Sequence, residues 1–212
     1  MPQPSSALSL PALYAILDPA QTKGRAAEIM LRELLAGGVA LLQLRLKTAP
    51  ASDFLQLAHI TRKLTHDYGC KLIVNDRVDI ALACEADGIH LGQEDLPLQA
   101  ARKLMGEKII GISTHDVEQA KEAKAGGADY IGFGPMFGTT TKATGYNARG
   151  LEMLRQICEA VTIPIVAIGG ITEANVADVW QAGAKSAAII SDLLGANDVT
   201  DKVRRILALH QK

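Results

Sequence analysis

Three threonines and a lysine lie close together in the segment Gly138-Thr139-Thr140-Thr141-Lys142. Threonine hydroxyls and backbone N–H groups beside a glycine can surround an oxyanion, and the lysine ammonium supplies the opposite charge. The segment follows Asp129–Phe133, an apolar run with β-branched and aromatic residues that is typical of a buried strand. Taken alone, it is equally compatible with a polar surface loop, so the rest of the chain decides between the two.

Three further polar side chains alternate where another apolar run ends. Gln43, Arg45 and Lys47 are spaced by two residues, so in an extended backbone they share one side of the chain. A lone pair of basic residues at a strand end is most often solvated surface charge. Their meaning therefore depends on what lies across from them.

Amide and acidic side chains follow the next two apolar runs. Asn75 and Asp76 come directly after Lys71–Val74, and Asp95 comes shortly after Gly88–Leu91. Each alone is typical of a turn. Together, carboxylates from adjacent strands would suit Mg²⁺, which is usually held by one or two carboxylates and completed by water and substrate phosphate. With the basic residues named above across from them, the pocket would suit a polyanion such as a pyrophosphate.

Two later segments indicate a second anion site. Ala167-Ile168-Gly169-Gly170-Ile171 frees backbone N–H groups with no side chain in the way, and the run Ser186–Ile190 exits through Ile190-Ser191. Tight turns would also explain both segments. In a barrel enzyme, however, the loops after strands seven and eight commonly bind phosphate, which we favour here. Two phosphorylated groups anchored at one mouth suggest a reaction that joins two phosphorylated molecules.

The histidines give a weaker signal. His90 lies inside an apolar strand and His115 follows another, positions that are more often structural, so neither is assigned a role. No Ser-His-Asp or Cys-His set for nucleophilic catalysis and no metal-binding histidine pair can be singled out.

The elements that must position these residues alternate regularly. Apolar runs of strand type are expected at residues 13–17, 39–44, 71–74, 88–91, 108–112, 129–133, 164–168 and 186–190. Helices are expected at 25–36, 52–68 (capped by Ser52), 78–84, 98–105, 117–125 (capped by Asp116), 150–160, 173–182 and 199–209. Eight such units predict an α/β fold, a single-domain (β/α)8 TIM barrel. An open doubly wound sheet is the alternative, but the first turn, Asp18-Pro19-Ala20, lacks its glycine-rich sequence.

Composition sets the outer bounds. The 212 residues fit one domain, 1–212, of which 1–11 is expected to be a loose N-terminal arm. A net charge of −1 argues against nucleic-acid binding, and the three cysteines lie too far apart for a zinc site. No segment is long and apolar enough for a membrane span, so a cytoplasmic location is expected. The sequence does not determine the oligomeric state.

Jointly, these residues resemble the thiamine-phosphate synthase family. The matching motifs, in order from about Leu13 to Ser191, are Gln43-x-Arg45-x-Lys47, Asn75-Asp76-Arg77, His90-Leu91-Gly92-Gln93-x-Asp95, Ser113-x-His115, Gly134-Pro135-x-Phe137-x-Thr139-x-Thr141-Lys142 and Ala167-Ile168-Gly169-Gly170-Ile171. Each motif is weak alone, but the ordered set is specific. The resemblance implies a barrel that couples hydroxymethylpyrimidine diphosphate to thiazole phosphate and releases pyrophosphate with Mg²⁺.

The resemblance also implies roles for single residues. Those expected to hold the pyrimidine diphosphate are Gln43, Arg45, Lys47, Asn75 and Lys142, with Ser113 on the pyrophosphate. Those expected to bind the thiazole phosphate are Thr139, Thr141, Gly170, Ile190 and Ser191. Asp76 and Asp95 would ligate Mg²⁺. The implied mechanism is dissociative, with pyrophosphate leaving before the thiazole nitrogen attacks, so the catalytic residues Arg45, Lys47, Lys142 and Ser113 serve a leaving group and no nucleophile is needed.

The chain departs from the common family pattern at Gly138 (commonly Pro), at Ala143-Thr144 (commonly an acidic residue) and at Asp192 (commonly Ala). A thiazole tautomerase of the same fold would need neither diphosphate nor metal and would be expected to lose the basic and acidic sets. A non-catalytic thiamine-pathway regulator would bind without turnover. A Schiff-base aldolase would need a lysine inside a strand, where only Lys71 and Lys108 occur, at strand starts.

Overall fold

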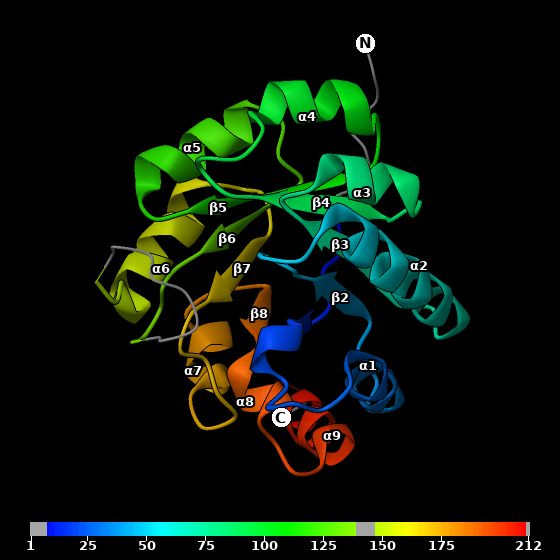
Figure 1. The fold of residues 1–212 in the computed structure, drawn as a ribbon. Helices are drawn as coiled ribbons and strands as arrows, with labels where there is room; N and C mark the ends of the chain where they lie inside the picture. The colour runs from blue at the N-terminus through cyan, green and yellow to red at the C-terminus, as the bar shows by residue number, and fades with distance from the viewer. Residues whose placement is uncertain (1–7, 139–146, 211–212) are drawn as a thin grey trace.

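Strands and helices alternate along the chain and close into a barrel (Figure 1). The computed structural model describes residues 8–138 and 147–210, so the predictions for Thr139, Thr141 and Lys142 lie outside the described residues. Within those two ranges, eight parallel strands pair in chain order and the last pairs with the first. The predicted (β/α)8 barrel is confirmed.

The element bounds agree closely with the sequence pattern. The strands are β1 (Leu13–Leu17), β2 (Leu41–Leu44), β3 (Lys71–Asn75), β4 (Gly88–Leu91), β5 (Ile109–Thr114), β6 (Tyr130–Phe133), β7 (Ile165–Ile168) and β8 (Ser186–Ile189). The helices are α1 (Ala27–Ala36), α2 (Ala51–Asp67), α3 (Val78–Ala83), α4 (Leu98–Met105), α5 (Val117–Ala125), α6 (Gly150–Ala160), α7 (Val176–Gln181), α8 (Ser191–Leu194) and α9 (Val199–His210), with a short 3₁₀ segment η1 (Pro19–Gln21).

Local details confirm one prediction and correct two others. The Asp116 cap is confirmed, because its carboxylate accepts the N–H of Gln119 at 2.9 Å. Ser52 is not a cap: α2 begins one residue earlier, and the Ser52 hydroxyl donates to Asp53 instead. The helix expected from Glu173 begins later because the Asn175 side chain closes a turn there. The four-residue α8 was not predicted.

Alternate residues of each strand serve two different cores. In β1, Leu13, Ala15 and Leu17 belong to the core between sheet and helices, whereas Tyr14 and Ile16 belong to a separate cluster inside the barrel. Successive side chains of a strand point to opposite faces, so this alternation also decides which residues at the strand ends face inward.

Glycines make room inside the barrel for two large side chains. A Cβ on Gly111 would lie 2.0 Å from Cζ of Tyr130, and a Cβ on Gly132 would lie 2.9 Å from Cε1 of His90. Such separations are far inside van der Waals contact, so only glycine fits at either position. The neighbouring strands thus leave space for a tyrosine and a histidine to lie across the interior.

The expected N-terminal arm is not loose where it is described. Leu8 and Leu10 pack against the interior cluster that contains Tyr14 and Val166. Apolar burial therefore holds this part of the segment on the barrel. Separately, no helix within residues 8–138 and 147–210 is long and apolar enough to cross a membrane.

Candidate active site

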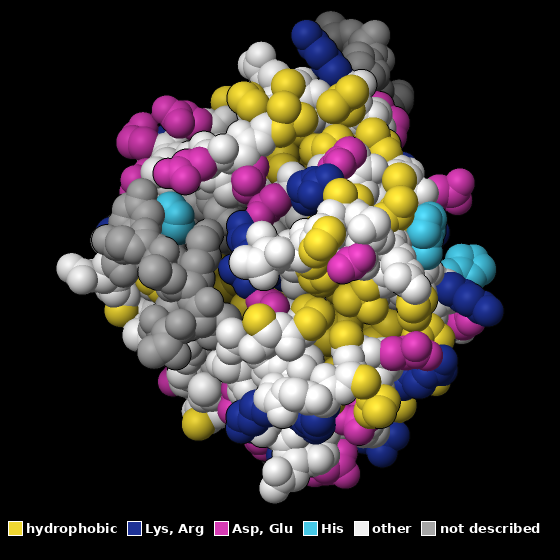
Figure 2. Space-filling view, in the orientation of Figure 1, with side chains coloured by type: hydrophobic (Ala, Val, Ile, Leu, Met, Phe, Trp, Pro, Cys, Tyr) yellow, Lys and Arg dark blue, Asp and Glu magenta, His cyan; other side chains and the backbone are white. Residues whose placement is uncertain are grey.

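One cavity collects the polar residues at the C-terminal ends of the strands. Its volume is about 1090 Å³, open mouth included. Ten residues singled out in the sequence line it: Gln43, Arg45, Lys47, Asn75, Asp76, Asp95, Ser113, Gly170, Ile190 and Ser191. Basic and acidic side chains meet near the middle of this face of the molecule (Figure 2). The structure thus brings together every predicted site residue that it describes.

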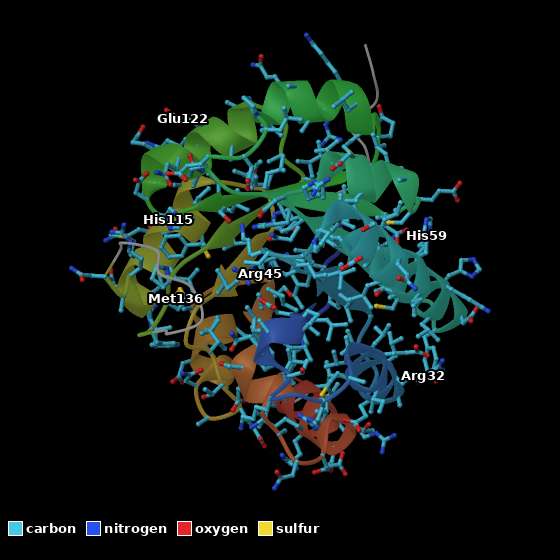
Figure 3. All side chains as sticks on the ribbon, viewed as in Figure 1. Arg32, Arg45, His59, His115, Glu122 and Met136 are labelled. Atoms are coloured by element: carbon cyan, nitrogen blue, oxygen red, sulfur yellow. The ribbon has the colours of Figure 1, made fainter. Side chains whose placement is uncertain are left out.

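The two cations on this side of the cavity already have acidic partners. Arg45 lies near the centre of the ring of strands (Figure 3), where its guanidinium donates to the buried carboxylate of Asp18. The Lys47 ammonium donates to Asp76. The prediction that these cations stand across from the carboxylates is therefore incomplete, because each one pairs with a carboxylate directly. Pairing holds both side chains in place while leaving further N–H groups for a ligand.

Two carboxylates lie together at the ends of β3 and β4. Asp76 has a left-handed backbone with φ 62°, which is uncommon for a residue other than glycine. An Oδ atom of Asp95 accepts the N–H of Gly92 at 2.7 Å. Burial raises the pKa of Asp95, and the neighbouring Asp76 carboxylate raises it further. Two like charges held this close favour a cation between them. No group of three or more potential metal-ligating side chains occurs in the described part of the chain.

Asn75 carries an unsatisfied donor inside the cavity. Its side chain is 7% exposed, and its Nδ2 has no hydrogen-bond partner among the described residues. An unpaired buried amide costs on the order of 1–3 kcal/mol. Asn75 is also one of the residues that line the cavity.

A chain of hydrogen bonds crosses the barrel interior beneath the cavity. Gln43 Nε2 donates to the Tyr14 hydroxyl at 3.0 Å, which lies 3.0 Å from the Tyr130 hydroxyl. The Tyr130 hydroxyl lies 3.0 Å from Nδ1 of His90, and Nε2 of His90 lies 2.9 Å from Oγ of Ser113. These contacts link β2 to β5 through the middle of the barrel.

The amide nitrogen at one end gives this chain a direction. With Gln43 Nε2 as donor to the Tyr14 hydroxyl, one arrangement of hydrogens satisfies all of these contacts: Tyr14 donates to Tyr130, and Tyr130 donates to His90 Nδ1. In this arrangement Nε2 of His90 carries the hydrogen and donates to Ser113, which can donate its own hydrogen to another acceptor. Burial raises the pKa of both tyrosines well above the ordinary value, so both stay protonated at neutral pH.

Glycine backbone forms the opposite wall. Gly169 and Gly170 have φ angles of 100° and 66°, and a Cβ on Gly170 would lie 2.5 Å from the carbonyl oxygen of Gly138. Asn175 fixes this turn, because its Nδ2 donates to Gly170 O at 3.1 Å and its Oδ1 accepts from Thr172 N at 2.8 Å. The positive φ angle and the close approach to Gly138 O both exclude a side chain at Gly170. A backbone that surrounds an anion needs such a position without a side chain.

Several residues of this site were not predicted from the sequence. His90 lines the cavity, and so do Tyr14 and His115. Nδ1 of His115 donates to Gly134 O at 2.6 Å. The signal for His90 was available: its neighbours Ile89 and Leu91 both belong to the outer core, so the residue between them must point inward.

Comparisons with known proteins point to one family. The family model described as thiamine monophosphate synthase matches residues 13–193. The thiamine-phosphate synthase of Chloroflexus aurantiacus is 45% identical over 93% of this chain and 91% of that protein. That of Moorella thermoacetica is 48% identical over 92% and 93%. Among solved structures, a thiamine phosphate pyrophosphorylase from Pyrococcus furiosus superposes with a TM-score of 0.88 at 38% identity, covering 94% of this chain and 95% of that one.

Proposed function

The chain belongs to the thiamine monophosphate synthase family of transferases, and from this premise we propose which substrates its cavity binds and how its residues act. The reaction joins 4-amino-2-methyl-5-hydroxymethylpyrimidine diphosphate to 4-methyl-5-(2-phosphoethyl)thiazole and releases pyrophosphate. The C–O bond to the diphosphate breaks, and the thiazole nitrogen forms a C–N bond to the pyrimidine methylene carbon. The observation that carries this proposal is the single cavity that combines cations, a carboxylate pair and a glycine cradle.

The diphosphate is assigned to the side of the cavity formed by β2 to β5. There Arg45 and Lys47 supply positive charge, and Asn75 is a further lining residue that we assign to the diphosphate. The directed hydrogen-bond chain leaves the Ser113 proton available to a diphosphate oxygen. Because these groups are fixed before the substrate arrives, they stabilise the charge that builds on the leaving diphosphate with little reorganisation.

Mg²⁺ fits the carboxylate pair. Asp76 and Asp95 are hard oxygen donors from adjacent strand ends, and two carboxylates are what Mg²⁺ needs when substrate phosphate and water complete its coordination. When bound there, the ion would supply positive charge to the departing diphosphate.

The thiazole phosphate is assigned to the glycine cradle on β7 and β8. Gly170 offers backbone without a side chain, and Ile190 and Ser191 lie at the start of α8. Thr139 and Thr141, outside the described residues, are proposed to complete this site, and Lys142 to complete the diphosphate site.

The chain's residues mainly bind and orient. The proposed reaction needs no side chain as a nucleophile. Departure of the diphosphate makes the pyrimidine methylene carbon electrophilic, and the thiazole nitrogen attacks it. The inward-facing, largely apolar wall formed by Val166, Ile168 and Ala188 limits water at the reacting carbon. We also propose a cytoplasmic location, because the free thiols of Cys70, Cys84 and Cys158 suit a reducing compartment.

Pyrophosphate release from purified protein tests this proposal. The assay supplies both phosphorylated substrates, first with Mg²⁺ and then with EDTA. Metal-dependent release that requires the thiazole phosphate, with thiamine phosphate forming in step, is expected. Binding of thiazole phosphate without turnover under either condition would instead favour a tautomerase or a non-catalytic regulator.

A further inference from the structure

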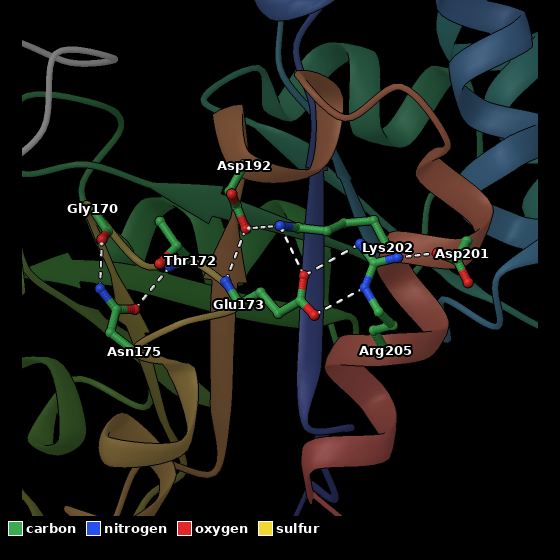
Figure 4. A network of polar contacts seen from close by, with 8 residues as sticks. All are labelled: Gly170, Thr172, Glu173, Asn175, Asp192, Asp201, Lys202 and Arg205. Atoms are coloured by element: carbon green, nitrogen blue, oxygen red, sulfur yellow. Dashed lines mark hydrogen bonds and ion pairs between the residues drawn. The ribbon is translucent and has the colours of Figure 1, made fainter.

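An ion-pair network lies directly behind the glycine cradle (Figure 4). The Lys202 ammonium lies 3.0 Å from a carboxylate oxygen of Asp192 and 3.0 Å from one of Glu173. Arg205 also binds Glu173, at 2.9 Å, and contacts Asp201. The network joins α9 to the two loops that form the cradle.

Asp192 connects those two loops. It follows Ser191 in α8, and its carboxylate accepts the backbone N–H of Glu173, from the loop after β7, at 2.9 Å. The same loop contains the turn that Asn175 fixes on Gly170. One carboxylate oxygen therefore ties the Ser191 side of the cradle to the Gly170 side.

This tie creates an electrostatic conflict. A carboxylate next to Ser191 would repel a phosphate bound at the same backbone, because solvent screens like charges poorly at short range in a partly buried site. Lys202 answers it. Its side chain is only 14% exposed and contacts Asp192 and Glu173 together. Burial acts to lower the pKa of Lys202, but its hydrogen bonds to Asp192 and Glu173 outweigh this and raise it, so it stays charged at neutral pH.

We propose that Lys202 is a positioning residue for the phosphate of the thiazole substrate: it holds Asp192 in the bridge between the two loops and cancels its charge. This inference rests on the proposed function, which places that phosphate at Gly170 and Ser191. Lys202 itself does not contact the substrate. Its effect is confined to the phosphate end of the cavity and does not extend to the diphosphate side.

The first test measures binding of the thiazole phosphate by calorimetry, without turnover. Lys202→Met is expected to weaken that binding roughly tenfold, because it leaves Asp192 uncompensated. Asp192→Asn removes the charge but keeps an oxygen that accepts the Glu173 N–H. The double variant Lys202→Met/Asp192→Asn should therefore bind within about twofold of wild type. Arg205→Met is the matched control: it removes another cation from Glu173 without touching Asp192, and should leave the affinity unchanged.

The outcomes separate this inference from the function on which it rests. If the double variant binds as weakly as Lys202→Met, Asp192 is not the reason for the loss and the inference is overturned. It is also overturned if Lys202→Met raises KM for the pyrimidine diphosphate as much as for the thiazole phosphate. Wild-type protein that binds thiazole phosphate but forms no thiamine phosphate would contradict the proposed function alone, and the binding series would still decide the role of Lys202.

Discussion

The Tyr130 hydroxyl lies 3.0 Å from Nδ1 of His90, and the two rings stack with their centroids 5.6 Å apart. This contact is the hub of the hydrogen-bond chain inside the barrel. When Tyr130 donates to Nδ1 of His90, Nε2 of His90 carries the hydrogen and donates to Ser113. Tyr130 contacts no substrate in the proposed complex. It nevertheless influences, through His90, whether the hydroxyl of Ser113 donates or accepts a hydrogen bond.

Tyr130→Phe should break the chain at this hub. It leaves His90 Nδ1 and the Tyr14 hydroxyl without their shared partner, which lowers the free energy of unfolding by about 1–3 kcal/mol. His90 can then take the other tautomer and accept from Ser113, so KM for the pyrimidine diphosphate should rise. Tyr68→Phe, which changes an exposed tyrosine outside the cavity, is the control. Urea denaturation and steady-state kinetics compare the two variants, and an unchanged KM for the pyrimidine diphosphate in Tyr130→Phe would contradict the directional chain.

Gly170→Ala should impair the thiazole phosphate site. The new Cβ would lie 2.5 Å from Gly138 O, on a backbone with φ 66°, so the turn must move. Gly127→Ala is a matched control, since Gly127 has φ 87° but nothing within 4 Å of a Cβ. Both variants should lose about 1 kcal/mol of stability from left-handed backbone. Calorimetry with the thiazole phosphate should show weaker binding only for Gly170→Ala; a similar loss in both variants would argue against a backbone cradle.

Asp95→Asn should make turnover depend on much higher Mg²⁺ concentrations. One carboxylate then remains at the proposed metal site, and loss of a ligand of this kind should lower activity about 100-fold at ordinary Mg²⁺. Asp79→Asn changes an exposed carboxylate on α3 that pairs with Arg77, and serves as the control. A Mg²⁺ titration of pyrophosphate release provides the measurement. An unchanged Mg²⁺ requirement in Asp95→Asn would remove Asp95 from the metal site.

Glu173→Gln should reduce stability at neutral pH but not in acid. Hydrogen bonds from Arg205 and Lys202 lower the pKa of Glu173 below its ordinary 4.5, despite the opposing effect of burial. A lowered pKa contributes stability above the unfolded value, and that contribution disappears as the pH falls through the folded value. Denaturation midpoints of wild type and variant should therefore converge below pH 4.5. Glu152→Gln, which loses an exposed pair with Arg155, should show almost no difference at any pH.

The alternation of side chains made much of this site predictable from sequence. Residues spaced by two at a strand end, such as Gln43 and Arg45, face the same way once the strand is placed. Strand placement was itself secure because eight apolar runs alternate with helical stretches. The short helix α8 was not predicted because four residues are too few to show a helical period of apolar side chains.

The partners of these residues were harder to foresee. Arg45 meets Asp18 because Leu17 pairs with Leu44 in the sheet, and that register is not written in either strand alone. Tyr14 and Tyr130 meet only because β1 and β6 face each other across a closed barrel. Contacts of this kind depend on how the barrel closes. Sequence patterns can therefore predict which side chains face the interior but not which of them contact one another.

At Asp76 the residue that is best for stability differs from the residue that the proposed metal site needs. Glycine adopts a φ of 62° without the roughly 1–2 kcal/mol penalty that a side chain pays there. A library selected only for thermal resistance would therefore enrich glycine at residue 76, and a library selected for thiamine phosphate formation would keep aspartate. Automated stabilisation of this enzyme would thus favour removal of a carboxylate that is proposed to bind Mg²⁺.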